Sequence, residues 1–125
     1  MILVFGGAYQ GKSSFVEEKF GVKKDMMYHC SDKNGLCFDS KVINNLDAYI
    51  LGAVGRNENP ISYIVRNLEN LRDKIIVCDD VSCGIVPLGK DLRLFRDNAG
   101  KILQILSREA DEVYRVFCGL GERLK

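Results

Sequence analysis

The chain has 125 residues, of which 46% are hydrophobic and 28% charged, which is typical of a globular protein with one hydrophobic core. We therefore predict a single domain over residues 1–125. Eighteen basic and seventeen acidic residues give a net charge of +1, so we predict no binding of nucleic acid and no association with a membrane. No apolar run approaches the roughly 20 residues that span a bilayer, and the expected location is cytoplasmic.

The cysteine and histidine content argues against a disulfide framework or a zinc module. The five cysteines form no Cys-x-x-Cys pair, and His29 is the single histidine. We expect reduced, mostly buried thiols at these positions: Cys30, Cys37, Cys78, Cys83 and Cys118.

Strands and helices alternate in the first part of the chain. Ile2–Phe5 is a continuous apolar run that ends at glycine, which is typical of a strand buried on both faces. Gly11–Phe20 has a helical pattern, and Gly21 stands where a C-terminal cap is expected. Asp25–Cys30 is predicted to be the second strand.

Two helices are predicted in the middle of the chain. Apolar residues recur at helical spacing from Ser40 to about Val54, and Ser40 is the predicted N-cap. A second helix is expected to begin at Asn59-Pro60 and to continue to Leu71, because proline is tolerated in the first helical turn.

The last third adds a strand over Lys74–Cys78, a helix from about Leu92 to Glu109, a strand over Glu112–Cys118 and an edge at Arg123–Lys125. This alternation predicts an α/β fold of the P-loop NTPase-like kind, a mostly parallel sheet with helices on both faces. Ligands of such sheets bind at the carboxyl ends of the strands.

The segment after the first strand matches the phosphate-loop pattern G-x-x-x-x-G-K-[ST]. Its glycines allow backbone N–H groups to approach phosphates, and the following helix directs its partly positive N-terminus at the same anion. Lys12 is expected to reach the β- and γ-phosphates, and the Ser13 hydroxyl to bind Mg²⁺. The predicted binding set for ATP or GTP is Gly6, Gly7, Ala8, Tyr9, Gln10, Gly11, Lys12, Ser13 and Ser14.

Asp79 and Asp80 follow an apolar strand, where a Walker B carboxylate is expected to hold Mg²⁺ directly or through water. The alternative is that one of them caps the following turn, for which aspartate is well suited. We predict Lys12, Asp79 and Asp80 as catalytic residues, and Ser13 and Asp80 as the residues that hold Mg²⁺.

Further segments resemble the adenosylcobinamide kinase / adenosylcobinamide-phosphate guanylyltransferase family. These are the N-terminal Ile2-Leu3-Val4 with the phosphate loop, residues 80–87 with Gly84-Ile85-Val86-Pro87, residues 93–100 with Phe95-Arg96-Asp97, and Ala110-Asp111-Glu112-Val113. The resemblance covers about half of the chain.

The resemblance implies a P-loop enzyme that phosphorylates the hydroxyl of adenosylcobinamide and then transfers GMP to that phosphate. It implies nucleotide and Mg²⁺ binding at Lys12 and Ser13, an acidic role for Asp80, and a homo-oligomer. Arg93 and Arg96 match family positions on the long helix and are candidate substrate or phosphate contacts; the alternative is a solvated helix face.

The chain also departs from the family pattern. It is shorter between the second strand and Asp79, where the resemblance implies a histidine that accepts GMP, and residues 30–78 contain no histidine. His29 lies out of register with that position, so guanylyl transfer by this route is not expected. Three hypotheses remain open: a phosphotransferase, a nucleotide-binding relative without transfer activity, and a P-loop kinase or NTPase for another small molecule.

Overall fold

The computed structural model describes residues 1–81 and 89–125. Its strands are β1 (Ile2–Gly6), β2 (Met27–His29), β3 (Val42–Asn44), β4 (Ile75–Asp79), β5 (Glu112–Phe117) and β6 (Leu120–Arg123). Its helices are α1 (Lys12–Phe20), the 3-10 helix η1 (Lys24–Met26), α2 (Leu46–Gly55), α3 (Pro60–Arg66), α4 (Leu68–Leu71) and α5 (Lys90–Glu109).

The strands form one six-stranded sheet in the order β2-β3-β4-β1-β5-β6. All neighbouring strands are parallel except β5 and β6, which form an antiparallel hairpin. The register places Gly6 of β1 beside Asp79 of β4. The carboxyl ends of β1, β3 and β4 therefore meet at one edge of the sheet, where the sequence predicts a ligand site.

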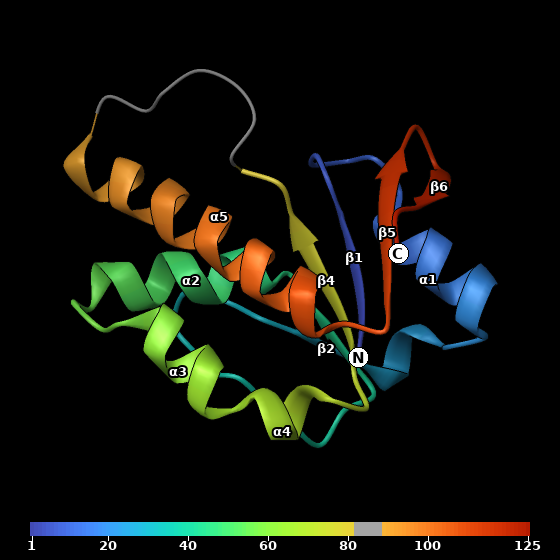
Figure 1. Cartoon of the computed structure of the whole chain (residues 1–125), viewed down its shortest axis with the longest axis horizontal. Coiled ribbons are helices and arrows are strands. Elements are labelled where there is room, and N and C mark those ends of the chain that lie inside the picture. Colours follow the sequence, from blue (N-terminus) through green and yellow to red (C-terminus); the bar gives the residue numbers. More distant parts are fainter. Residues whose placement is uncertain (82–88) are drawn as a thin grey trace.

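Helices cover both faces of the sheet, as predicted, with α1 on one side and α2, α3 and α5 on the other (Figure 1). The core under α1 contains Val4, Val16 and Val116 together with Tyr114. The larger core on the other face joins strand residues to α2, α3 and α5 and includes Ile50, Ile64, Ile76 and Ile102 among its fully buried members. The strands of the central sheet are apolar on both faces because both faces are covered.

The predicted helix from Ser40 to Val54 is wrong in its first third. Val42–Asn44 forms strand β3, all three residues are buried, and α2 begins only at Leu46. Asn45 separates the two elements because it adopts a left-handed conformation, with φ of 58°. A short apolar run fits helical and extended patterns equally well, and here pairing of β3 with β2 and β4 decides for the strand.

Further differences affect the second strand, the helix that begins at Pro60 and the edge strand. The second strand is shorter than Asp25–Cys30 because η1 occupies its first part. The helix predicted to end at Leu71 begins at Pro60 as expected but is interrupted at Asn67, which separates α3 from α4. The edge strand lies earlier than Arg123–Lys125, at Leu120–Arg123.

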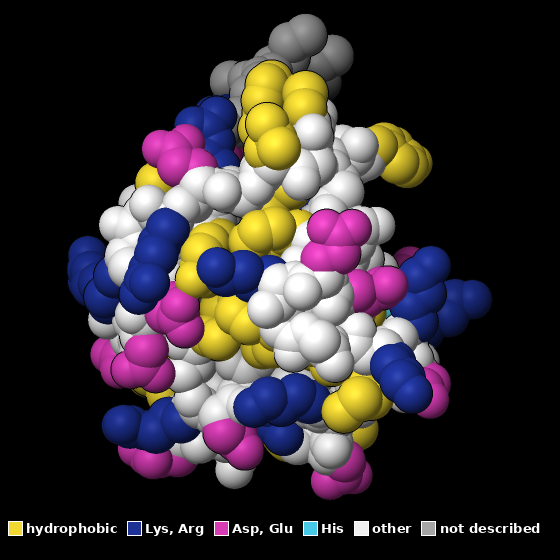
Figure 2. Space-filling model, turned by 90° about the vertical axis from the view of Figure 1, so that its right-hand side faces the viewer, with side chains coloured by type: hydrophobic (Ala, Val, Ile, Leu, Met, Phe, Trp, Pro, Cys, Tyr) yellow, Lys and Arg dark blue, Asp and Glu magenta, His cyan; other side chains and the backbone are white. Residues whose placement is uncertain are grey.

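The face that carries α1 and the β5–β6 hairpin shows charges of both signs around apolar side chains (Figure 2). Among the described helices, none is long and apolar enough to cross a membrane. The four cysteines in the described part of the chain carry free thiols, and burial raises the pKa of Cys30 to about 12. Cys83 and the Gly84-Ile85-Val86-Pro87 segment lie outside the described residues.

Candidate functional site

The glycine-rich loop between β1 and α1 is tied to the sheet by backbone hydrogen bonds at both of its ends. At the start, the Asp80 N–H donates to the Gly6 carbonyl oxygen at 2.8 Å. At the end, the Gln10 carbonyl accepts from the Gly119 N–H at 2.8 Å, and the Gln10 side-chain Oε1 accepts from the Cys118 N–H at 2.7 Å. The turn between β5 and β6 thus fixes the half of the loop that leads into α1.

Two glycines of the loop are required by the local geometry. A Cβ atom at Gly6 would overlap the carbonyl oxygen of Val116 in the neighbouring strand β5. Gly11 has a positive φ of +86°. A Cβ atom at this position would lie 3.3 Å from the Cα atom of Gly119. These two positions let the loop pass close to the end of β5 and turn into α1.

The N-terminus of α1 is open to an anion. Its N-cap, Gly11, has no side chain to accept the first N–H groups, and the first turn contains no acidic residue. The orphan N–H groups at a helix start carry a partial positive charge, which favours phosphate or carboxylate groups. This end of α1 is therefore suited to the anion site that the sequence predicts.

Lys12 is the charged centre of this region and is only 8% exposed. Its Nζ lies 2.6 Å from Oδ1 of Asp79 and donates a 2.7 Å hydrogen bond to the carbonyl oxygen of Gly7. The ammonium group is thus held beside the loop, with a carboxylate as its counter-ion.

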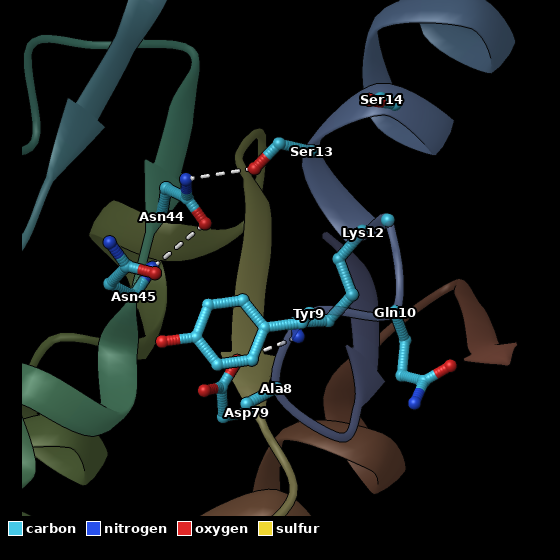
Figure 3. A pocket seen from close by; sticks show the side chains of 10 residues that line it. Ala8, Tyr9, Gln10, Lys12, Ser13, Ser14, Asn44, Asn45 and Asp79 are labelled. Atoms are coloured by element: carbon cyan, nitrogen blue, oxygen red, sulfur yellow. Dashed lines mark hydrogen bonds and ion pairs between the residues drawn. The ribbon is translucent and has the colours of Figure 1, made fainter. Parts of the chain in front are cut away.

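A pocket of about 360 Å³ lies over this loop, between α1 and the ends of β3 and β4 (Figure 3). We call it the loop pocket. In Figure 3 the Lys12 and Asp79 side chains approach each other at one end of the pocket, and Ser13 and Asn44 do so at the other. The loop pocket is lined by Ala8, Tyr9, Gln10, Gly11, Lys12, Ser13, Ser14, Asn44, Asn45 and Asp79.

Sequence reasoning missed Asn44 and Asn45, because it placed both inside a helix. Asn44 ends β3, is 5% exposed, and donates from Nδ2 to the Ser13 Oγ at 3.1 Å. The available signal was a polar pair directly after the apolar Val42-Ile43, the same pattern that singled out Asp79 and Asp80 after the apolar residues of β4.

Asp47, in the first turn of α2, was also missed. Its Oδ1 accepts a 3.0 Å hydrogen bond from the backbone N–H of Asp79. Burial raises the pKa of Asp47, and the negative charge of Asp79 acts in the same direction. Asp47 thus fixes the backbone of β4 at the residue whose side chain pairs with Lys12.

The remaining predicted residues lie away from the loop pocket. Asp80 lines a separate hollow beside α5, together with Phe5, Gly100, Leu103, Gln104, Ser107 and Arg108. Arg96 lines a neighbouring hollow that shares Gly100 and Gln104 with the first one. Arg93 is exposed on α5, and neither arginine lines the loop pocket. Of the two strand-end carboxylates, the structure brings Asp79 to Lys12.

The chemistry of the loop pocket fits Mg²⁺, which prefers oxygen ligands and keeps several of its waters. The Ser13 hydroxyl and the Asp79 carboxylate both line this pocket, whereas the Asp80 side chain lines the other hollow. Ser13 and, through water, Asp79 are the residues with which the pocket would hold the ion.

The mostly parallel sheet and the glycine-rich loop between β1 and α1 define an α/β protein with a P-loop NTPase-like fold. The sequence model of the family described as "CobU: Cobinamide kinase / cobinamide phosphate guanyltransferase" matches residues 41–124, and the chain belongs to this family. The family resemblance seen in the sequence is thereby confirmed.

Two curated relatives are similar over a shorter stretch. The bifunctional adenosylcobalamin biosynthesis protein CobU of Salmonella typhimurium is 43% identical over 51 residues, which are 41% of this chain and 28% of that protein. The protein of the same name from Escherichia coli K12 is 41% identical over 51 residues, with the same shares of each chain. The aligned part thus spans little more than a quarter of the length of these relatives.

Proposed function

We propose that the chain binds ATP or GTP with Mg²⁺ in the loop pocket and transfers a phosphoryl group to an alcohol, with adenosylcobinamide as the first candidate acceptor. The family match supports a nucleotide-dependent kinase or transferase related to cobalamin biosynthesis. That match begins at residue 41, so the proposal for the phosphate loop, residues 6–13, rests on its sequence pattern and its geometry.

The observation that carries the proposal is the position of Lys12 at the uncapped N-terminus of α1. A buried ammonium group and the free N–H groups of a helix start converge on one pocket. Ammonium and backbone N–H donors of this kind bind phosphate through charge-assisted hydrogen bonds and do not require an enclosed apolar cavity.

In the proposed reaction Lys12 leaves Asp79 for the β- and γ-phosphates. The acceptor hydroxyl then attacks the γ-phosphorus, the bond from this phosphorus to the bridging oxygen breaks, and ADP or GDP leaves. Asp79, freed from Lys12, takes the hydroxyl proton. The chain's contribution is the positioning of reactants and the stabilisation of charge.

Mg²⁺, when bound, neutralises charge on the phosphate oxygens. The Ser13 hydroxyl and the Asp79 carboxylate would hold the ion, and both line the same pocket as Lys12. We do not extend the proposal to guanylyl transfer, because the chain has one histidine and its Nδ1 is a hydrogen-bond partner of Asn44.

Titration calorimetry of the chain with ATP and GTP in the presence of Mg²⁺ tests the nucleotide site. Lys12→Ala should weaken binding about 10- to 100-fold, since a charge-assisted hydrogen bond contributes about 1.5–3 kcal/mol. Lys24→Ala is the matched control, because Lys24 lies in η1, is exposed and does not line the loop pocket. Absence of nucleotide binding by the unmodified chain would refute the proposal.

The transfer step is tested by ³¹P NMR of the chain incubated with ATP, Mg²⁺ and adenosylcobinamide. The expected result is a new phosphate ester together with ADP, and loss of both in Asp79→Asn. Nucleotide binding without transfer to any alcohol would support the second candidate, a nucleotide-binding relative without activity. That candidate is favoured by the short aligned segment, which covers 28% of the bifunctional relatives.

A further inference from the structure

The Asn44 side chain makes three hydrogen bonds and has only one orientation that satisfies them. Its Oδ1 accepts from the backbone N–H of Asn45 at 2.9 Å. Its Nδ2 lies 3.1 Å from the Ser13 Oγ and 3.1 Å from the Nδ1 of His29. Asn44 is 5% exposed, and as a buried polar side chain it relies on these protein partners.

The Asn45 backbone N–H decides the orientation, because it can only donate. A flipped amide would set the Asn44 NH₂ group against this N–H and leave two donors facing each other. Since Nδ2 can only donate, the Nδ1 of His29 is the acceptor of this hydrogen bond. His29 and Asn45 therefore hold the Asn44 amide from two sides.

This orientation sets the direction of the Ser13 hydroxyl. The Ser13 Oγ accepts from Asn44, so its own proton is not used on Asn44 and is available to the loop pocket. A carboxylate at position 44 would act in the opposite way: it would accept the Ser13 proton and add a negative charge beside the pocket. The hydroxyl would then present only lone pairs to the pocket.

We propose that Asn44 is a positioning residue that makes the Ser13 hydroxyl donate its proton to a bound phosphate oxygen, while one lone pair stays available to Mg²⁺. The inference rests on the proposed nucleotide site and adds to it a direction for the hydrogen bond at Ser13. It follows that nucleotide binding by this chain depends only weakly on Mg²⁺, because the protein group that would contact the ion directly is a neutral hydroxyl and the Asp79 carboxylate would reach it only through water.

The test compares the Kd of ATP in Mg²⁺ with the Kd of ATP in EDTA for three proteins. In the unmodified chain the two values should differ by less than about fivefold. In Asn44→Asp the ratio should rise by about tenfold or more, because the carboxylate reverses the Ser13 hydrogen bond, repels free ATP and attracts the hydrated ion.

Asn45→Asp is the matched control. Asn45 lines the same pocket and is exposed, and aspartate tolerates its left-handed conformation. This variant adds the same charge to the pocket without touching Ser13, so its ratio should rise less than that of Asn44→Asp. Equal ratios in the two variants would overturn the inference, as would loss of ATP binding by the unmodified chain in EDTA alone.

A measurement on the protein without nucleotide separates this inference from the proposed function. In ¹⁵N-edited NMR spectra the Asn44 side-chain amide protons should be slow to exchange and should shift on Ser13→Ala. Unaffected signals would refute the orientation even if nucleotide binds. If the unmodified chain binds nucleotide neither in Mg²⁺ nor in EDTA, the proposed function is refuted, and with it the role of Ser13 toward phosphate. The orientation of Asn44 is then still tested by the NMR result.

Discussion

The Nζ of Lys12 lies 2.6 Å from Oδ1 of Asp79, and the two side chains are only 8% and 26% exposed. The cation that is proposed to bind phosphate is therefore paired with a carboxylate in the protein without nucleotide. A bound phosphate and Asp79 would compete for the same ammonium group, and the pair would have to open when nucleotide binds.

Replacement of Asp79 by asparagine should separate binding from transfer. The amide keeps an oxygen that can accept from Lys12 but removes the negative charge that repels phosphate, so in EDTA, where Asp79 has no ion to hold, we expect ATP to bind about 3- to 10-fold more tightly. Phosphoryl transfer should fall strongly, because the variant lacks the proton acceptor. Calorimetry and ³¹P NMR measure the two effects. Asp73→Asn, an exposed aspartate, serves as control, and weaker ATP binding by Asp79→Asn would contradict the competition.

Alanine at Gly6 and at Gly7 should have different effects on stability. At Gly6 the new methyl group meets the Val116 carbonyl oxygen, and the backbone of β5 has little room to move, so we expect a loss of about 2 kcal/mol or more in the free energy of unfolding. At Gly7 the nearest atom is Cγ of Gln10 at 3.6 Å, an ordinary contact, and the loss should be below about 1 kcal/mol. Urea denaturation measures both. Equal losses would show that the approach of β5 does not require Gly6.

Gln10→Ala should loosen the contact between the loop and the β5–β6 turn. The Cys118 N–H loses its acceptor, which should cost about 0.5–1.5 kcal/mol of stability and speed the hydrogen exchange of this amide. Gln104→Ala, an exposed position on α5, should change stability by less than about 0.5 kcal/mol. If the exchange of the Cys118 amide is unchanged in Gln10→Ala, the side-chain contact does not fix the loop in solution.

Asp47 makes stability depend on pH. Burial raises the pKa of this carboxyl in the folded protein above its ordinary value of 3.8, so the folded state binds its proton more strongly than the unfolded state. The contribution of Asp47 to stability therefore falls as pH rises from 3.8 through the raised pKa and is constant above it. Asp47→Asn keeps an oxygen for the Asp79 N–H and removes the titration.

The stability advantage of Asp47→Asn over the unmodified chain should thus grow as the pH rises from 3.8 through the raised pKa of Asp47. Urea denaturation across this range measures it. An advantage that is constant with pH, or that shrinks as pH rises, would show that the Asp47 carboxyl is not destabilised by its burial.

Much of the fold was predictable because local patterns were unambiguous. Three elements had a pattern that fits only one kind of secondary structure, and the structure confirms them: the apolar run Ile2–Phe5, the long amphipathic helix α5 and the helix start at Pro60. The strand β3 was not predictable in the same way. Val42-Ile43 continues the apolar spacing of α2, so only its pairing between β2 and β4 identifies it as extended.

The sequence by itself determined the phosphate-loop pattern, with Lys12 and Ser13 at fixed places before a helix, and the family resemblance, because both depend on residues close together in the chain. Only the tertiary structure decided which distant groups surround them. Asn44 contacts Ser13 across 31 residues of sequence, and Asp47 contacts Asp79 across 32. The reason is the strand order, which sets β4 between β1 and β3 and so gathers side chains from separate strand ends around one loop.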